Sequence, residues 1–67
     1  MKRYIVLYRI ESIMAPCDPP FGFECHADDT DHAEEQCENA YPEAGIVWVS
    51  DAATYAAALA DYYETEV

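Results

Sequence analysis

The chain contains no lysine or arginine after Arg9, which stands near its amino-terminal end. Its three basic residues are Lys2, Arg3 and Arg9, and all fourteen aspartates and glutamates follow them. The formal net charge is −11 over 67 residues, so most carboxylates cannot be paired within one molecule. Any fold of this chain must therefore tolerate considerable repulsion between its own side chains.

The composition is nevertheless that of a folded protein. Apolar residues make up 52% of the chain and aromatic residues 13%, which is far from the low hydrophobicity of disordered segments. A chain of this length buries only about 60% of the surface that it exposes when unfolded. We therefore expect one domain, residues 1–67, with one small core.

The sequence predicts a cytoplasmic protein. Residues 1–8 begin like a signal peptide, but Arg9 and Glu11 interrupt the apolar run and no small-residue cleavage site follows. No other segment approaches the length of a membrane span. The three cysteines are odd in number, which favours a reducing compartment over a disulfide-bonded secreted scaffold.

Three segments are typical of strands. Residues 3–11 are rich in β-branched and aromatic types and are apolar on both faces, which indicates a middle strand. Residues 21–26 alternate between apolar and other side chains, as in a half-buried strand antiparallel to the first, and residues 46–49 form an apolar run typical of a buried strand. The prolines of residues 13–20 predict a loop.

Two segments are typical of helices. The first begins at Asp29 or Asp31 as its cap, ends at Pro42, and has an apolar stripe made by Ala33, Cys37, Ala40 and Tyr41. The second is capped by Ser50 or Asp51, and its apolar stripe is Ala52, Tyr55, Ala56, Leu59 and Tyr62 or Tyr63.

These elements predict an α+β fold of order ββαβα, with a three-stranded mixed sheet and both helices packed on one face. The sheet is expected to be mixed because a right-handed crossover through the first helix sets the third strand parallel to a neighbour. The expected core is Val6, Tyr8, Phe23, Cys37, Val47 or Trp48, and Leu59.

The first helix carries the clearest functional pattern. Asp31, Glu34, Glu35 and Glu38 share one sector opposite the apolar stripe and span about 10 Å of helix axis. Phosphates follow each DNA strand at about 3.4 Å of axis, so this row is compatible with a short run of phosphates. The other interpretation is an ordinary solvated helix face, although such faces usually carry lysine four residues after glutamate.

The second helix continues the acidic bias with Asp51, Asp61, Glu64 and Glu66 around it. The candidate partner-binding residues are Asp28, Asp29, Asp31, Glu34, Glu35, Glu38, Asp61 and Glu64.

Other kinds of site have little support in the sequence. Cys17, Cys25, His26, His32 and Cys37 are residue types that bind zinc, but they form no close Cys-x-x-Cys pair and no i, i+4 helical chelate. The negative surroundings raise thiol pKa values, and no phosphate-binding glycine loop is present. We expect no catalytic residue, metal or cofactor, and the shortage of cations argues against direct nucleic-acid binding.

Part of the chain looks like a pattern of small phage-encoded proteins of unassigned role. The similar segments are residues 23–29, 31–36, 40–42 and 46–49. In size, acidity and compactness the chain also resembles small acidic anti-CRISPR proteins, some of which block a CRISPR effector complex by occupying its DNA-binding groove. This resemblance implies a non-enzymatic inhibitor that acts by binding in the host-cell cytoplasm.

The leading hypothesis is an inhibitor whose carboxylates mimic phosphates and occupy a basic groove of a CRISPR effector or another nucleic-acid-handling protein. The alternative is a homodimeric structural or assembly module of a phage, whose exposed strand edge pairs with its mate and whose acidity serves only solubility. A third is a small metal or redox protein. The predicted partner is therefore a basic protein, and no contact with a membrane is expected. The chain itself is expected to be a monomer or a homodimer.

Self-repulsion predicts how salt affects stability. Added sodium chloride should raise the free energy of unfolding of the isolated protein, because ions screen unpaired carboxylates over a Debye length of about 10 Å at 0.1 M. Urea denaturation at increasing salt measures this effect. Stability that falls steadily with salt would show that internal ion pairs dominate instead.

Overall fold

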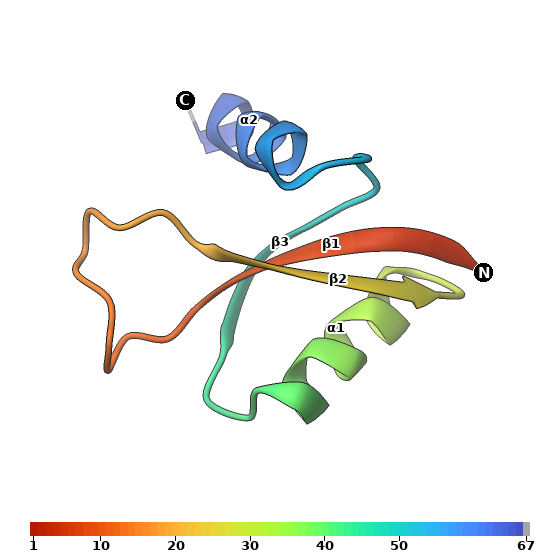
Figure 1. Ribbon diagram of the computed structural model, residues 1–67, viewed down its shortest axis with the longest axis horizontal. Coiled ribbons are helices and arrows are strands. Elements are labelled where there is room, and N and C mark those ends of the chain that lie inside the picture. The colour runs from red at the N-terminus through yellow and green to blue at the C-terminus, as the bar shows by residue number, and fades with distance from the viewer. Residues whose placement is uncertain (67) are drawn as a thin grey trace.

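Strand β1 (Lys2–Arg9) lies at the centre of a three-stranded sheet, between β2 (Phe21–Ala27) and β3 (Gly45–Ser50). The computed structural model describes residues 1–66, and helices α1 (Thr30–Ala40) and α2 (Tyr55–Glu66) complete the order ββαβα (Figure 1). The α+β class, the element order and the central position of the first strand are as the sequence predicts.

The sheet is antiparallel throughout, so the prediction of a mixed sheet is wrong. Strand β1 pairs antiparallel with β2 and antiparallel with β3. The two outer strands therefore run in the same direction, as a crossover through α1 requires, but β1 lies between them. Because β1 is buried from Tyr4 to Tyr8, its backbone groups there need partners on both sides, and the middle position supplies them.

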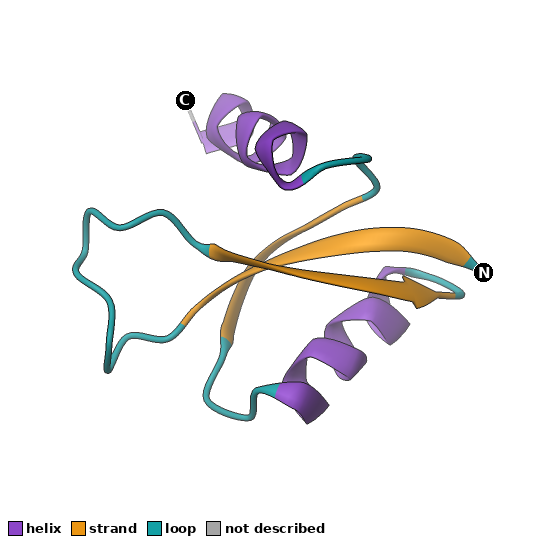
Figure 2. Ribbon diagram, in the orientation of Figure 1, coloured by secondary structure: helices purple, strands orange, loops and turns teal. Residues whose placement is uncertain are grey.

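The helices cover opposite faces of the sheet, so the prediction that both pack on one face is also wrong (Figures 1 and 2). Tyr4, Val6 and Tyr8 point toward α1, whereas Ile5 and Leu7 point toward α2. All five side chains are at most 7% exposed. A strand that is apolar on both faces needs a cover on each side, and one helix per face provides it.

Helix α1 begins where one of the two predicted caps places it. The Asp29 side chain accepts a hydrogen bond from the His32 N–H at 2.8 Å, so Asp29 rather than Asp31 is the cap. Ala33 and Cys37 are fully buried against the sheet, as predicted. Ala40 is exposed instead, because the helix ends there and leads into the exposed cap residue Tyr41.

A bulge in β3 places two successive side chains on the same face. Leu7 pairs with Trp48 and Tyr8 pairs with Ile46, which leaves Val47 without a partner opposite β1. Both Val47 and Trp48 pack on the side of α2. The sequence predicts either Val47 or Trp48 in the core, and the bulge places both side chains against it.

Helix α2 starts later than the sequence predicts. Thr54 is its cap, with the Thr54 Oγ1 accepting from the Ala57 N–H at 3.2 Å. The predicted cap Ser50 is the last residue of β3 and pairs with Ile5, so its backbone belongs to the sheet. With this start, Ala58 is buried in the core in place of the predicted Ala56. Leu59, which the sequence also predicts in the core, packs against the same cluster.

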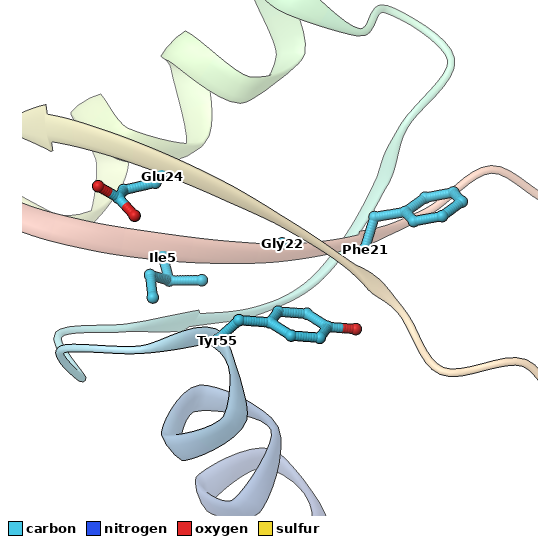
Figure 3. Close-up of a pocket in the computed structure, with 5 residues that line it drawn as sticks. All are labelled: Ile5, Phe21, Gly22, Glu24 and Tyr55. Carbon is cyan, nitrogen blue, oxygen red and sulfur yellow. The ribbon is translucent and has the colours of Figure 1, made fainter.

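Tyr55 fastens the start of α2 to β2. Its ring lies against Gly22, and a Cβ atom added at Gly22 would stand 2.5 Å from the ring (Figure 3). The Tyr55 hydroxyl donates a hydrogen bond to the Pro20 carbonyl, which holds the ring in place. Glycine weakens a strand by itself, so Gly22 is explained by the close approach of this ring.

Gly22→Ala should therefore destabilise the protein by about 1–3 kcal/mol, because the new methyl group overlaps the Tyr55 ring, which could move only by giving up its hydrogen bond to the Pro20 carbonyl. Gly45→Ala is the matched control, since a Cβ there meets only the Arg9 carbonyl at 3.7 Å. The cost of Gly22→Ala should vanish in a Tyr55→Ala background when both are measured by chemical denaturation. Equal effects of the two alanines, or a cost that persists without Tyr55, would contradict this packing.

Candidate functional site

Arg9 holds the proline-rich loop between β1 and β2. Its guanidinium donates to the Asp18 carbonyl at 2.6 Å and to the Ala15 carbonyl at 2.9 Å, and it pairs with the Glu11 carboxylate at 3.2 Å. The loop projects beyond the ends of the strands (Figure 1). One of the three cations of the chain is therefore occupied in ordering this loop.

Arg3 is occupied in a second internal contact. Its guanidinium lies 2.7 Å from the Glu24 carboxylate, across the pairing of β1 with β2. Among the side chains that the structure describes, the ion pairs are this one and Arg9 with Glu11. Both are surface pairs and add little stability.

The carboxylates around α1 form one exposed surface, which we call the acidic α1 surface: Asp28, Asp31, Glu34, Glu35 and Glu38. Within the described part of the chain, none of them is in an ion pair with lysine or arginine. Glu34 is half-buried at the flank of the helix, whereas the other four are exposed. The predicted candidate Asp29 is used as the helix cap, so its carboxylate is partly engaged within the molecule.

The two remaining candidates lie on the other side of the sheet. Asp61 and Glu64 belong to α2, which covers the face opposite α1. The Ser50 hydroxyl donates to the Asp61 carboxylate at 3.5 Å, so this side chain lies toward the end of β3. The predicted candidates therefore lie on two separate surfaces, one on each side of the sheet.

The cysteines and histidines do not gather into one metal-binding group within the described residues. No group of three His, Cys, Asp or Glu side chains in residues 1–66 is arranged to hold a metal ion. Burial raises the pKa of the Cys37 thiol to about 11, with contributions from nearby Cys25 and Glu38, and burial also raises the pKa of Cys25. His32 is engaged at the start of α1, where its Nδ1 accepts from the Asp28 N–H at 3.3 Å.

A cavity of about 350 Å³ lies between β2 and the start of α2 (Figure 3). It is lined by Ile5, Phe21, Gly22, Glu24 and Tyr55. Glu24 is its one titratable carboxyl group and is paired with Arg3, and burial raises the pKa of the Tyr55 hydroxyl, which donates to a backbone carbonyl. These groups include neither a nucleophile with a base nor a pair of carboxylates.

A second cavity, of about 240 Å³, lies at the carboxyl-terminal end of α1. It is lined by Ile10, Ala40, Tyr41, Pro42 and Glu43. The sequence pattern marks Pro42 only as the end of the helix, so it does not predict a site at this place. The signal that was present is a helix without a basic residue in its last turn, followed at once by an aromatic residue, a proline and a glutamate.

Comparisons with models of protein families, with curated proteins and with solved structures find no match to this chain. Neither of the helices within residues 1–66 has the length and apolar character needed to cross a membrane.

The cysteine environments predict unequal reactivity. Cys17 is exposed and should react with iodoacetamide in the native protein at pH 8, whereas buried Cys25 and Cys37 should react only on unfolding, because their raised pKa values keep them protonated. Mass spectrometry after timed labelling should show one added group, and three in urea. Rapid native labelling of Cys25 or Cys37 would show a reactive thiol and revive a redox role.

Proposed function

We propose that this protein is a non-enzymatic inhibitor that binds a basic nucleic-acid-handling protein, such as a CRISPR effector, through the acidic α1 surface. The observation that carries this proposal is the distribution of charge. Arg3 and Arg9 are committed to internal contacts, while the acidic α1 surface has no ion pair in the described residues. A groove lined by lysine and arginine would supply the missing charge.

The spacing of the carboxylates supports a phosphate-like role. From Asp31 to Glu38 the helix rises about 10 Å, so its four carboxylates have a mean axial spacing close to the axial rise of about 3.4 Å per phosphate of one DNA strand. Because Asp29 caps α1 and its sheet-facing residues are buried, the row is held on a rigid element. Binding then costs less ordering than it would for a flexible acidic tail.

Charge reversal at two exposed positions tests the proposal. Glu35→Lys with Glu38→Lys should leave the fold intact, as both residues face solvent, and should weaken binding about 100-fold or more. The matched control is Asp51→Lys with Glu64→Lys on the α2 side, which changes the formal charge by the same amount. The control should weaken binding to the partner about fivefold or less, because it removes only long-range attraction.

The partner for this measurement is obtained by capture on the immobilised protein from a nuclease-treated bacterial lysate. The captured protein should release labelled DNA or RNA when the native inhibitor is added, and Glu35→Lys with Glu38→Lys should fail to displace it. A partner that holds this protein and its nucleic acid together would contradict mimicry. Equal losses in the two double variants would mean that only net charge matters.

The open sheet edges favour a second candidate, a homodimeric assembly module. Strands β2 and β3 each pair with β1 alone within the described residues, so each leaves one row of backbone groups for another strand. Self-pairing would bring together two chains of charge −11, and it should therefore strengthen with salt. Sedimentation at low and high salt separates this candidate from the inhibitor, whose binding to a basic partner weakens with salt.

A further inference from the structure

The cavity at the carboxyl-terminal end of α1 has the size of a side-chain site. Its volume of about 240 Å³ is below the range of roughly 300–1,000 Å³ that is typical of pockets for small molecules. The wall combines apolar Ile10 and Pro42 with aromatic Tyr41 and acidic Glu43. A long side chain with an apolar stem and a positive end matches both parts of this lining.

The helix end adds negative character from the backbone. The Tyr41 N–H donates to the Cys37 carbonyl at 2.8 Å, and the Ala44 N–H donates to the Tyr41 carbonyl at 2.9 Å. Pro42 has no N–H, so the Glu38 carbonyl lacks the donor that would stand four residues later. Free carbonyls and the negative end of the helix dipole favour a cation here, and α1 has no basic residue in its last turn.

We propose that this cavity binds an arginine side chain of the basic partner, an inference that rests on the proposed function. Arginine fits better than lysine because its guanidinium is planar, weakly hydrated and able to donate to a carboxylate and to carbonyls at the same time. It also stacks on aromatic rings, and Tyr41, whose ring is stacked on Tyr8 on one face, is still 42% exposed. Lysine brings a compact, strongly hydrated charge that gains less from this lining.

The cavity lies beyond the carboxyl-terminal end of the acidic α1 surface, on the side of the apolar stripe to which Ala40 belongs. Ala40, which lines the cavity, lies about 14 Å along the helix axis from Asp31. A partner that follows the row of carboxylates reaches the cavity if it also extends around the carboxyl-terminal end of the helix. The row attracts many arrangements of positive charge, whereas the cavity selects one side chain at a fixed place and so sets the register of binding.

A titration with short capped peptides tests the cavity without the partner. Backbone amide NMR signals of Ala40, Tyr41, Glu43 and Ala44 should shift on addition of a Gly-Arg-Gly peptide. Gly-Lys-Gly should bind at least about fivefold more weakly, and the uncharged Gly-citrulline-Gly should cause no shift. Ala40→Met should abolish the response by filling the cavity, and Glu43→Gln should weaken it. Ala60→Met and Glu64→Gln on α2 are the matched controls, and both should leave the response unchanged.

Equal responses to the three peptides, shifts confined to residues 31–38, or an undiminished response of Ala40→Met would overturn the arginine site. Those results would leave the proposed function standing, because Glu35 and Glu38 are tested separately. If the titration is positive but the partner binds the variant with Glu35 and Glu38 reversed as tightly as the native protein, the proposed function is overturned. The assignment of the bound arginine to that partner is then overturned as well.

Discussion

The structure depends on the burial of both faces of β1. Five successive side chains, Tyr4 to Tyr8, are at most 7% exposed, and in a strand successive side chains point to opposite faces. Such a strand needs hydrogen-bonding neighbours on both edges and a cover on both faces. The short chain meets all four requirements with two strands and two helices, and this leaves little freedom in where the remaining residues can lie.

This requirement also decides where the charge is displayed. Because α1 and α2 cover different faces, their carboxylates cannot form one continuous surface. Arg3 and Arg9 lie on the central strand and are used to hold β2 and the proline-rich loop. The cations thus contribute to local order, while the carboxylates of α1 have no ion pair in the described residues. The resulting repulsion lowers stability, and a basic partner would relieve it.

The sequence predicted the elements better than their arrangement. Periodicity and composition identify each strand and helix, the central place of β1 and the buried residues Ala33 and Cys37, because these depend on local patterns. The antiparallel pairing of β3 with β1 and the placement of the helices depend on how distant segments share the edges and faces of β1, which a pattern in one segment does not encode. Two successive side chains on one face at Val47 and Trp48 require a bulge. The start of α2 at Tyr55, after its cap Thr54, follows from the use of Ser50 by the sheet.

For the candidate site, the row of carboxylates on α1 follows from helical geometry, and the sequence was sufficient to predict it. The separation of Asp61 and Glu64 from that row required the sheet topology. The cavity beside Tyr41 and Glu43 required the approach of Ile10, which is thirty or more residues away in the chain. Contacts between distant segments are the information that residue spacing lacks.

The central claim is that the α1 side of the molecule is the binding surface. Hydrogen–deuterium exchange of the free protein and of its complex with the captured partner tests this most directly. The account predicts added protection in residues 28–44, with the amides of α2 unchanged. Protection that appears on α2 or along the outer edge of β3, while residues 28–44 exchange as in the free protein, would contradict it.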